Sequence, residues 1–196
     1  MTTFINLNEV KGEHIVLDKP GSYTAFFYNK SGLFNFELNA KNVELNIYGL
    51  YIGRRDDIFK VETIQHHNAP LTTSNLFIKG VFKDRSKFLY KGLIRIEKKG
   101  QTSHAYQKNQ NLVLSKDAFI ESKPYLEILA NDVFCTHGST TGKINEDELY
   151  YLQTRGVAKE QAKDLIVTGF INDIIDRLGN NTLALEIRKN ILNDAV

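Results

Sequence analysis

The strongest constraint on the fold is the alternation of apolar and polar residues, which continues from the start of the chain to about residue 137. A period of two is typical of half-buried β-strands. Gly, Asn, Asp and Lys residues separate the apolar runs. The sequence therefore predicts a body built from successive short strands. The runs are Phe34, Phe36 and Leu38; Val43, Leu45 and Ile47; Leu76 and Ile78; Leu112 and Leu114; and Leu126 and Ile128.

The spacing of the later runs favours one kind of β fold. Runs begin or end at Leu112, Ile120, Leu126 and Val133, only six to eight residues apart. A sandwich or barrel would show spacings of roughly 8 to 12 residues and clear hairpin signals such as Asn-Gly. The sequence contains no Asn-Gly pair. A β-solenoid is therefore the preferred prediction, and periodicity alone leaves a sandwich open.

The apolar pattern changes to a helical period after Ile144. Asn145 is expected to cap a first helix, and Glu148 three residues later can complete a capping box. Ile144 can pack against Leu149 across the start of this helix. Gly156 is placed to end it. The sequence thus predicts helices after the β-rich body.

Two further helices are predicted. The second ends before Gly179, and the third begins at about Thr182 with Asn181 as its cap. Residues 1–143 are therefore expected to form a β-solenoid domain and residues 144–196 a helical domain. The second helix carries an apolar stripe of Ala162, Leu165, Ile166, Phe170, Ile174 and Leu178, and the third aligns Leu183, Ile187 and Ile191.

Charge and composition exclude several classes of function. The 196 residues include 25 basic and 23 acidic side chains, and a net charge of +2 creates no large field for a nucleic acid or an acidic membrane. A single cysteine rules out an internal disulfide. The N-terminus shows no signal peptide, and no apolar run is long enough to cross a bilayer. We expect a cytoplasmic protein that binds neither nucleic acid nor membrane.

Cys135 and His137 are the first candidates for chemistry. Residues two apart on a strand point the same way, so this thiol and imidazole share a face with Val133. Both groups bind zinc or iron, and an imidazole beside a thiol can lower its pKa. Burial in phase with Val133 is the more common role of a free cysteine. Because structural metal sites need about four ligands, completion within the chain would require His104, His66 or His67.

Other motifs carry weaker signals. The segment from Gly138 to Lys143 resembles a phosphate-binding loop but has three residues between its glycines instead of four, and Ile144 follows the lysine. We expect it to lead from the last strand into the first helix. His66 and His67 are adjacent, so a strand would send them to opposite faces. The acidic residues Asp56, Asp57, Glu127 and Asp132 are scattered without the pairing that glycoside hydrolysis needs.

Several motifs in one order resemble the SufB/SufD family. Together they extend over about residues 61 to 178. They are HNAPLTTSNLFIKG at 67–80, DRS at 84–86, GLIRIE at 92–97, NLVLS at 111–115, SKPYLEI at 122–128, NDVFCTHG at 131–138 and YLQTRG at 151–156.

This resemblance implies a fold and a role. The fold would be a right-handed parallel β-helix followed by a small helical domain. Members work in SufB–SufC–SufD complexes, where SufC is an ABC-type ATPase that docks on the C-terminal helices and the β-helices pair with each other. The chain would then be a non-catalytic scaffold that pairs with a SufB-type paralogue or with itself. The matching SufC-docking residues are Glu148, Tyr151, Leu152, Arg155 and Gly156.

The resemblance favours SufD over SufB. Cys135 and His137 match the Cys-x-His pair of SufD at the subunit interface. Asn109 stands where SufB has a cysteine, and Gly138 stands where SufB has a glutamate. We therefore expect that the chain binds no cofactor stably by itself, and that iron or an iron–sulfur cluster is held transiently between subunits. The long N-terminal region of most members is missing from the sequence.

Two alternatives belong to other classes. A β-solenoid enzyme acting on carbohydrate would need a groove lined by carboxylates. A structural interaction module would bury Cys135 without using it. The reactivity of the Cys135 thiol separates the second alternative from the scaffold hypothesis.

Overall fold

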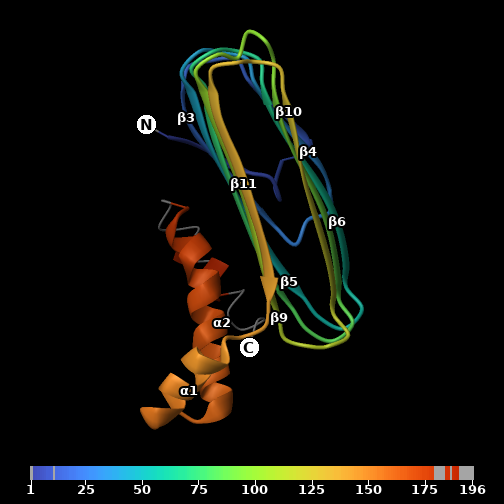
Figure 1. The fold of residues 1–196 in the computed structure, drawn as a ribbon, viewed down its shortest axis with the longest axis vertical. Helices are drawn as coiled ribbons and strands as arrows, with labels where there is room; N and C mark the ends of the chain where they lie inside the picture. Colours follow the sequence, from blue (N-terminus) through green and yellow to red (C-terminus); the bar gives the residue numbers. More distant parts are fainter. Residues whose placement is uncertain (1, 11, 179–183, 186, 190–196) are drawn as a thin grey trace.

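The structure is a computed structural model that describes residues 2–10, 12–178, 184–185 and 187–189. Two β-sheets face each other, and two helices lie outside them (Figure 1). One sheet, here called sheet A, contains β1 (Thr3–Asn6), β3 (Gly21–Tyr28), β5 (Val43–Gly53), β7 (Thr73–Phe82), β9 (Ser103–Val113) and β11 (Val133–Gly142) in that order. Sheet B contains β2 (His14–Leu17), β4 (Gly32–Leu38), β6 (Ile58–His67), β8 (Lys87–Ile96) and β10 (Phe119–Ile128).

The chain winds between the two sheets as a solenoid. Successive strands alternate between the sheets, and every pairing within a sheet is parallel. Residues paired in neighbouring coils are 20 to 22 positions apart in the first coils and 29 to 32 apart in the later ones, as in the hydrogen bonds that join Arg55 to Asp84 and Asp84 to Ser115. A sandwich of antiparallel hairpins is therefore excluded, and the predicted parallel β-solenoid is confirmed.

The strands are longer than their apolar runs suggested. Ile120 and Leu126 begin separate runs in the sequence but lie on the single strand β10. The inward positions between them are Ser122 and Pro124, which pair in register with Tyr90 and Gly92 of β8. Polar and small residues at inward positions break the alternation, so one strand looks like two.

The corners of the coils carry a repeat that is hidden in the sequence. Asn42, Leu71 and Thr102 precede β5, β7 and β9, and all three have φ between 55° and 61°. A positive φ is unfavourable for leucine and threonine. Hydrogen bonds between stacked corners stabilise this conformation: the Leu71 amide donates to the Gln101 carbonyl, and the Thr102 amide donates to the Asp132 carbonyl in the next coil. Without glycine at these corners, the sequence gives no sign of the repeat.

Aromatic rings fill the interior of the early coils. The Phe27 and Phe34 rings stack with centroids 4.7 Å apart, and the Tyr51 ring lies 4.8 Å from that of Phe88. The Tyr51 hydroxyl donates a 2.6 Å hydrogen bond to the Lys30 carbonyl. Such rings bury large apolar areas and favour these stacked and tilted arrangements. This cluster joins the two sheets.

A polar network lies beside that apolar core. The buried His67 imidazole is 2.7 Å from the Thr72 hydroxyl and 2.8 Å from the Ser74 hydroxyl. Ser74 donates its proton to Gln65, so its oxygen can accept from the imidazole Nε2–H, while the Thr72 hydroxyl donates to the Ala69 carbonyl. Burial lowers the pKa of His67 to about 4. The ring is therefore neutral in the folded protein at physiological pH.

The neutral His67 predicts a dependence of stability on pH. In the unfolded chain its pKa returns to about 6.5, so the unfolded state binds a proton that the folded state excludes. This stabilising contribution is complete above pH 6.5 and is lost as the pH falls from 6.5 through about 4, by about 1.4 kcal/mol per pH unit. Urea unfolding at pH 7.5 and 5 measures it. The free energy of unfolding of His67→Gln should depend less on pH over this range. An unchanged pH dependence in that variant would contradict the assignment.

The helices begin where the period changes. Asn145 caps α1 (Glu146–Thr154), and its side-chain oxygen accepts a 2.8 Å hydrogen bond from the Asp147 amide. Gly156 has φ +86°, and the amides of Gly156 and Val157 donate to the carbonyls of Gln153 and Leu152. This pair of bonds is the Schellman motif that ends helices. The predicted start and end of this helix are confirmed.

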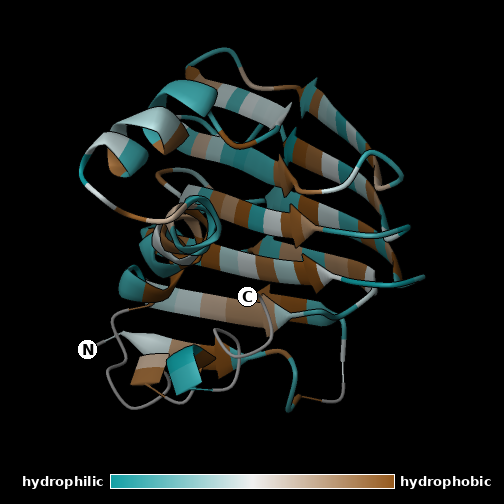
Figure 2. Ribbon diagram, turned by 90° about the horizontal axis from the view of Figure 1, so that it is seen from below, coloured by the Kyte–Doolittle hydropathy of each residue, from teal (hydrophilic) through white to brown (hydrophobic). Residues whose placement is uncertain are grey.

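The second helix, α2 (Lys159–Asp176), packs on the outer face of sheet A (Figure 2). The predicted stripe is partly wrong, because Leu165 is 53% exposed. Val167, Ile171 and Ile175 are buried instead, since the strands of sheet A contact a neighbouring side of the helix. In the third predicted helix, Asn181, Thr182, Leu183 and Ile191 lie outside the described residues. Residues 184–185 and 187–189 are helical, and Ile187 is buried in the cluster around α2.

A buried lysine fastens α2 to the solenoid. Lys79 Nζ of β7 lies 2.6 Å from Asp173, donates a 3.0 Å hydrogen bond to the Phe170 carbonyl, and lies 4.3 Å from the Phe170 ring centroid. Burial lowers the pKa of Lys79, and Asp173 opposes this change. Neither α1 nor α2, nor any other described helical segment, is long and apolar enough to cross a membrane.

Candidate functional site

The last coil leaves one end of the solenoid open. Its strands, β10 and β11, are the final strands of sheets B and A, so each has one edge without a neighbouring strand in the described structure. Leu126 and Ile94 are in register and point inward from adjacent strands, yet Ile94 is fully buried and Leu126 is 40% exposed. The difference arises because no further coil covers Leu126. Inward side chains of the last coil therefore reach the surface.

Cys135 and His137 lie at this open end. Cys135 pairs in register with Ala105, and His137 pairs with Gln107. Both β9 residues are buried, so the two candidates on β11 have the inward phase. Cys135 is half-buried and His137 is exposed. The prediction that they share one face of a strand is confirmed.

The environment of Cys135 differs from the prediction in one respect. Its side chain packs against a cluster that includes Ile94, Ile96 and Ala105. Burial raises the pKa of the Cys135 thiol to about 11. In the chain by itself the His137 imidazole therefore does not lower this pKa, because apolar contacts disfavour the thiolate, and Cys135 packs in phase with Val133 as free cysteines commonly do.

This pKa predicts slow alkylation of Cys135. In the folded chain at pH 7.5 the thiolate fraction is small, and the rate of reaction with iodoacetamide should rise about tenfold per pH unit until the pH nears 11. Mass spectrometry of timed samples measures the rate. His137→Ala should leave the pH profile in place. A profile with its midpoint below 8.5, abolished by His137→Ala, would show instead that the imidazole activates the thiol.

The other histidines do not complete a metal site. His66 Nε2 is 3.1 Å from Glu97, the buried His67 bonds to Thr72 and Ser74, and the His104 ring lies 5.9 Å from that of Phe134. Within the described ranges, no group of three or more His, Cys, Asp or Glu side chains could hold a metal ion. Recruitment of these histidines is therefore excluded, and Cys135 and His137 supply two donors.

Asn109 and Gly138, the two positions that the resemblance singled out, lie close to this site. Asn109 is buried on β9, in register with Ser139, and bonds to Asn111. Gly138 has the outward phase of β11, and a Cβ there would meet no atom within 4 Å. An acidic side chain would fit at Gly138 without steric conflict. The glycine at this position therefore removes a possible carboxylate ligand and is not required by packing.

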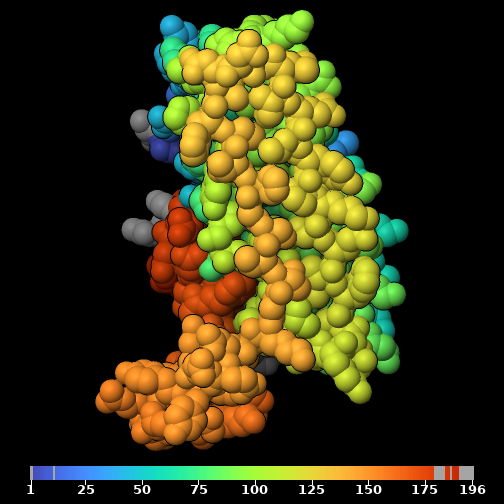
Figure 3. All heavy atoms as spheres, in the orientation of Figure 1, coloured from blue at the N-terminus to red at the C-terminus, as the bar shows by residue number. Residues whose placement is uncertain are grey.

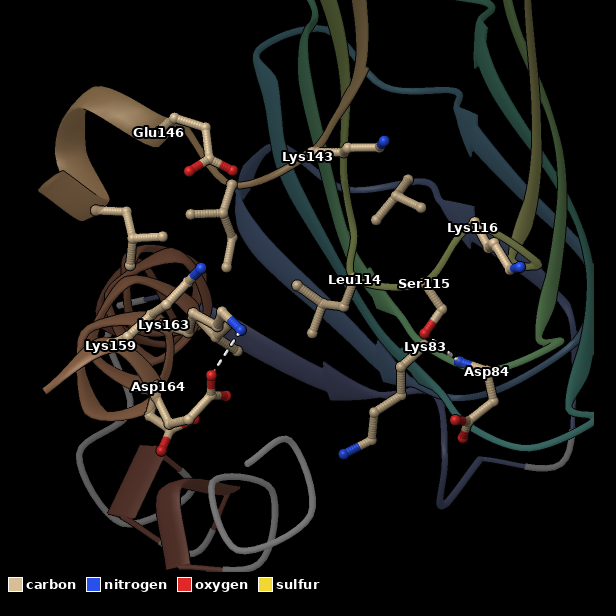
Figure 4. A pocket seen from close by; sticks show the side chains of 15 residues that line it. Lys83, Asp84, Leu114, Ser115, Lys116, Lys143, Glu146, Lys159, Lys163 and Asp164 are labelled. Atoms are coloured by element: carbon tan, nitrogen blue, oxygen red, sulfur yellow. Dashed lines mark hydrogen bonds and ion pairs between the residues drawn. The ribbon is translucent and has the colours of Figure 1, made fainter.

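The glycine-containing segment forms no phosphate loop. Gly138 and Gly142 belong to β11 itself, and only Lys143 lies in the link to α1. Lys143 lines a cavity of about 520 Å³ between the solenoid corners and the helices (Figure 4). Five lysines and four carboxylates line this cavity, and Lys163 pairs with Glu160 at 2.8 Å. The mixed charge does not favour a phosphate.

Among the described residues, the cavity that comes nearest to the groove required by a carbohydrate-acting enzyme lies on sheet B. Glu62 and Glu127 line a shallow cavity of about 410 Å³ on the outer face of sheet B. Lys91 lies 2.9 Å from Glu62, and Arg95 lies 3.5 Å from Glu127. Glu62 pairs with Lys91, and Glu127 shares Arg95 with the nearer Glu97, so both carboxylates of this cavity lie beside cations.

The predicted docking residues lie in the helical lobe formed by α1 and the first half of α2. Glu148 and Tyr151 are exposed on α1, and Leu152 is half-buried. Arg155 is the C-cap of α1, with its guanidinium 5.2 Å from the Tyr151 ring centroid, and Gly156 follows it. All five residues are thus in one short stretch. Tyr150, which no sequence motif singled out, is 70% exposed and adjoins them.

Fold and site together define a parallel β-solenoid protein with an appended helical lobe. The family model of the "SUF system FeS cluster assembly, SufBD core domain" matches residues 31–170. The chain therefore belongs to the SufB/SufD family.

Individual relatives agree with this assignment. The chain is 28% identical over 151 residues to the iron–sulfur cluster assembly protein SufD of Escherichia coli, covering 77% of this chain and 36% of that protein. It is 32% identical over 122 residues to a SufBD family protein of Synechocystis sp., covering 62% and 27% of the two chains. A SufBD family protein of Staphylococcus saprophyticus is 30% identical over 112 residues, covering 57% and 24%. The chain thus spans no more than 36% of the length of these relatives.

Proposed function

We propose that this chain is a SufD-like scaffold subunit of an iron–sulfur cluster assembly complex in the cytoplasm. Its open solenoid end pairs with a SufB-type paralogue or with a second copy, and its helical lobe binds a SufC-type ABC ATPase. The chain itself turns over no substrate. Membership of the SufB/SufD family and the SufD-type residues Asn109 and Gly138 support this assignment.

The open end of the solenoid carries the proposal of pairing. Strands β10 and β11 present backbone groups without neighbours in the described structure, and unpaired strand edges favour pairing with another chain. Leu126 adds exposed apolar surface at the same end. A partner that covered this end would bury all three features together.

The same end supports a shared site for iron or a cluster. Cys135 and His137 supply one thiol and one imidazole, which are ligands of iron and of iron–sulfur clusters. Because two donors do not close a site, the remaining ligands would come from the partner. Iron or the cluster is then cargo held at the interface. Binding through Cys135 would also release the thiol proton.

Copurification with the SufB-type and SufC-type proteins of the same organism tests the pairing. The chain should recover the SufC-type protein together with either the SufB-type protein or a second copy of itself, and reconstitution with iron and sulfide should give the absorbance of a cluster. Cys135→Ala and His137→Ala should reduce the cluster yield while pairing persists. Thr140→Ala, on the outward face of the same strand, is the matched control. Failure to bind either partner, or full cluster yield in the Cys135→Ala, His137→Ala double variant, would refute the proposal.

A further inference from the structure

The open end of the solenoid carries a buried amide next to His137. Strands β10 and β11, yellow and gold in Figure 3, form the face that no further coil of the described structure covers. One strand deeper, Gln107 of β9 is in register with His137, shares its inward phase and is 2% exposed. Its Nε2 donates a 3.4 Å hydrogen bond to the Gly92 carbonyl of sheet B.

The oxygen of this amide lacks a donor. Gln107 Oε1 is buried and accepts no hydrogen bond from any residue in the described ranges. Buried polar atoms are nearly always hydrogen-bonded, because an unpaired one loses its contacts with water and gains nothing in exchange. The last coil lies directly over Gln107, so the inward side chains of that coil are the candidates for the missing donor.

A neighbouring pair of residues shows that side chains of β9 and β11 reach one another. Adjacent strands are about 4.8 Å apart. Asn111 and Thr141 are the in-register pair four residues further along these two strands, and Asn111 Nδ2 donates to the Thr141 hydroxyl at 3.2 Å. Gln107 and His137 have the same relation in register and phase. A hydrogen bond between their side chains therefore needs a rotation of side chains and no shift of the strands.

The His137 imidazole has an N–H available for this bond. His137 is exposed, and its ring has no hydrogen-bond partner in the part of the chain that the structure describes. A neutral imidazole carries one N–H and one lone pair. Donation of the N–H to Gln107 Oε1 leaves the lone pair on the other nitrogen, which is the arrangement found in histidines that bind metals.

We propose that Gln107 is a positioning residue for His137. When a partner covers the open end and excludes water, the imidazole turns inward and donates its N–H to Gln107 Oε1, and its other nitrogen keeps a lone pair toward the interface. The inference rests on the proposed shared site and adds the residue that sets the tautomer and orientation of one of its donors. Loss of such a partner lowers metal affinity roughly 10- to 100-fold.

Substitutions at Gln107 test the inference in the complex with the partner that copurifies. Co²⁺ alone, without iron or sulfide, is the probe, because it absorbs light when a thiolate such as that of Cys135 binds it. Gln107→Met keeps the length of the buried side chain but removes the acceptor, and should weaken Co²⁺ binding about tenfold or more. Gln107→Glu keeps an acceptor oxygen at the same place and should restore the affinity to within about threefold of the unchanged chain.

Gln65→Met is the matched control. Gln65 is another fully buried inward amide, and it lies on β6, one coil further from His137 than Gln107. The substitution removes the hydrogen bond that Gln65 accepts from Ser74, so it also deletes an internal contact. Its Co²⁺ affinity should equal that of the unchanged chain, because the lost contact does not involve His137.

Nitrogen-15 spectra give a second measurement that a merely structural role of Gln107 would not change. The chain is labelled at histidine only and bound to unlabelled partner without metal, and the His137 signals are assigned by their loss in His137→Ala. One tautomer of His137 should predominate in the unchanged chain, and Gln107→Met should give a mixture of both tautomers.

The outcomes separate this inference from the proposed function. If the unchanged chain recovers no partner, or if the complex binds no Co²⁺, the proposed function fails and the inference fails with it. If the complex binds Co²⁺ but Gln107→Met keeps the tautomer and the affinity, only the inference is overturned. The same conclusion follows if Gln107→Glu or Gln65→Met weakens Co²⁺ binding as much as Gln107→Met does.

Discussion

Replacement of Tyr51 by alanine should lower the free energy of unfolding by about 4 kcal/mol, since removal of a buried aromatic ring costs roughly 3–5 kcal/mol. Tyr51 is fully buried on β5 and contacts the rings of Phe27, Phe59 and Phe88. These rings come from both sheets, so a cavity at Tyr51 would weaken the contact between the sheets. Urea unfolding followed by circular dichroism measures the loss.

Tyr51→Phe separates the ring from the hydroxyl. It keeps the stacking but leaves the partly buried Lys30 carbonyl without the 2.6 Å hydrogen bond, at a cost of about 1 kcal/mol. The order of stability should be the unchanged chain, then Tyr51→Phe, then Tyr51→Ala. Equal losses in the two variants would mean that the hydrogen bond, and not the ring, joins the sheets.

The second large effect is expected at the contact between α2 and the solenoid. Asp173→Asn leaves the ammonium of Lys79 with 10% side-chain exposure and without its carboxylate. Loss of one partner of a buried pair costs roughly 3–5 kcal/mol, and the 44% exposure of Asp173 reduces the expected loss to about 2 kcal/mol. Lys79→Met should cost less, because the exposed carboxylate of Asp173 remains hydrated.

A double-mutant cycle measures this coupling. The combination Lys79→Met and Asp173→Asn should be more stable than Asp173→Asn alone, because it removes the unpaired buried charge. Hydrogen exchange in α2 reports whether the helix loosens from sheet A. Additive losses in the cycle would show that the ion pair does not hold α2 in place.

The sequence predicts the solenoid fold but not the lengths of its strands. Apolar inward residues such as Leu45 and Ile47 follow the period of two, and they lie in the interior as expected. Inward Gln107, Asn109 and Asn111 on β9 are also buried. Hydropathy does not reveal polar residues inside a solenoid, because burial is stabilised by hydrogen bonds within the strand, as between Asn109 and Asn111, and to other strands, as from Gln107 to Gly92.

The sequence predicts which face of the strand carries the candidate site, but not the exposure of its side chains or the pKa of its thiol. The spacing of Cys135 and His137 places them on one face of a strand, and β11 has that arrangement. Their exposure depends on the position of β11 as the last strand of sheet A, which only the stacking of coils determines. The raised pKa of Cys135 depends on Ile94 and Ile96, about 40 residues away along the chain.

The open last coil has a thermodynamic consequence. In a solenoid each coil is stabilised mainly by its immediate neighbours, so a terminal coil has about half the stabilising interfaces of an internal one. Local opening should therefore cost less free energy in β10 and β11 than in the internal strands, and their amides should exchange faster than those of β5 to β8. A partner that covers this end would supply the missing neighbour. The ordering of the strand that carries Cys135 and His137 would then be coupled to assembly, and protection of its amides would report complex formation directly.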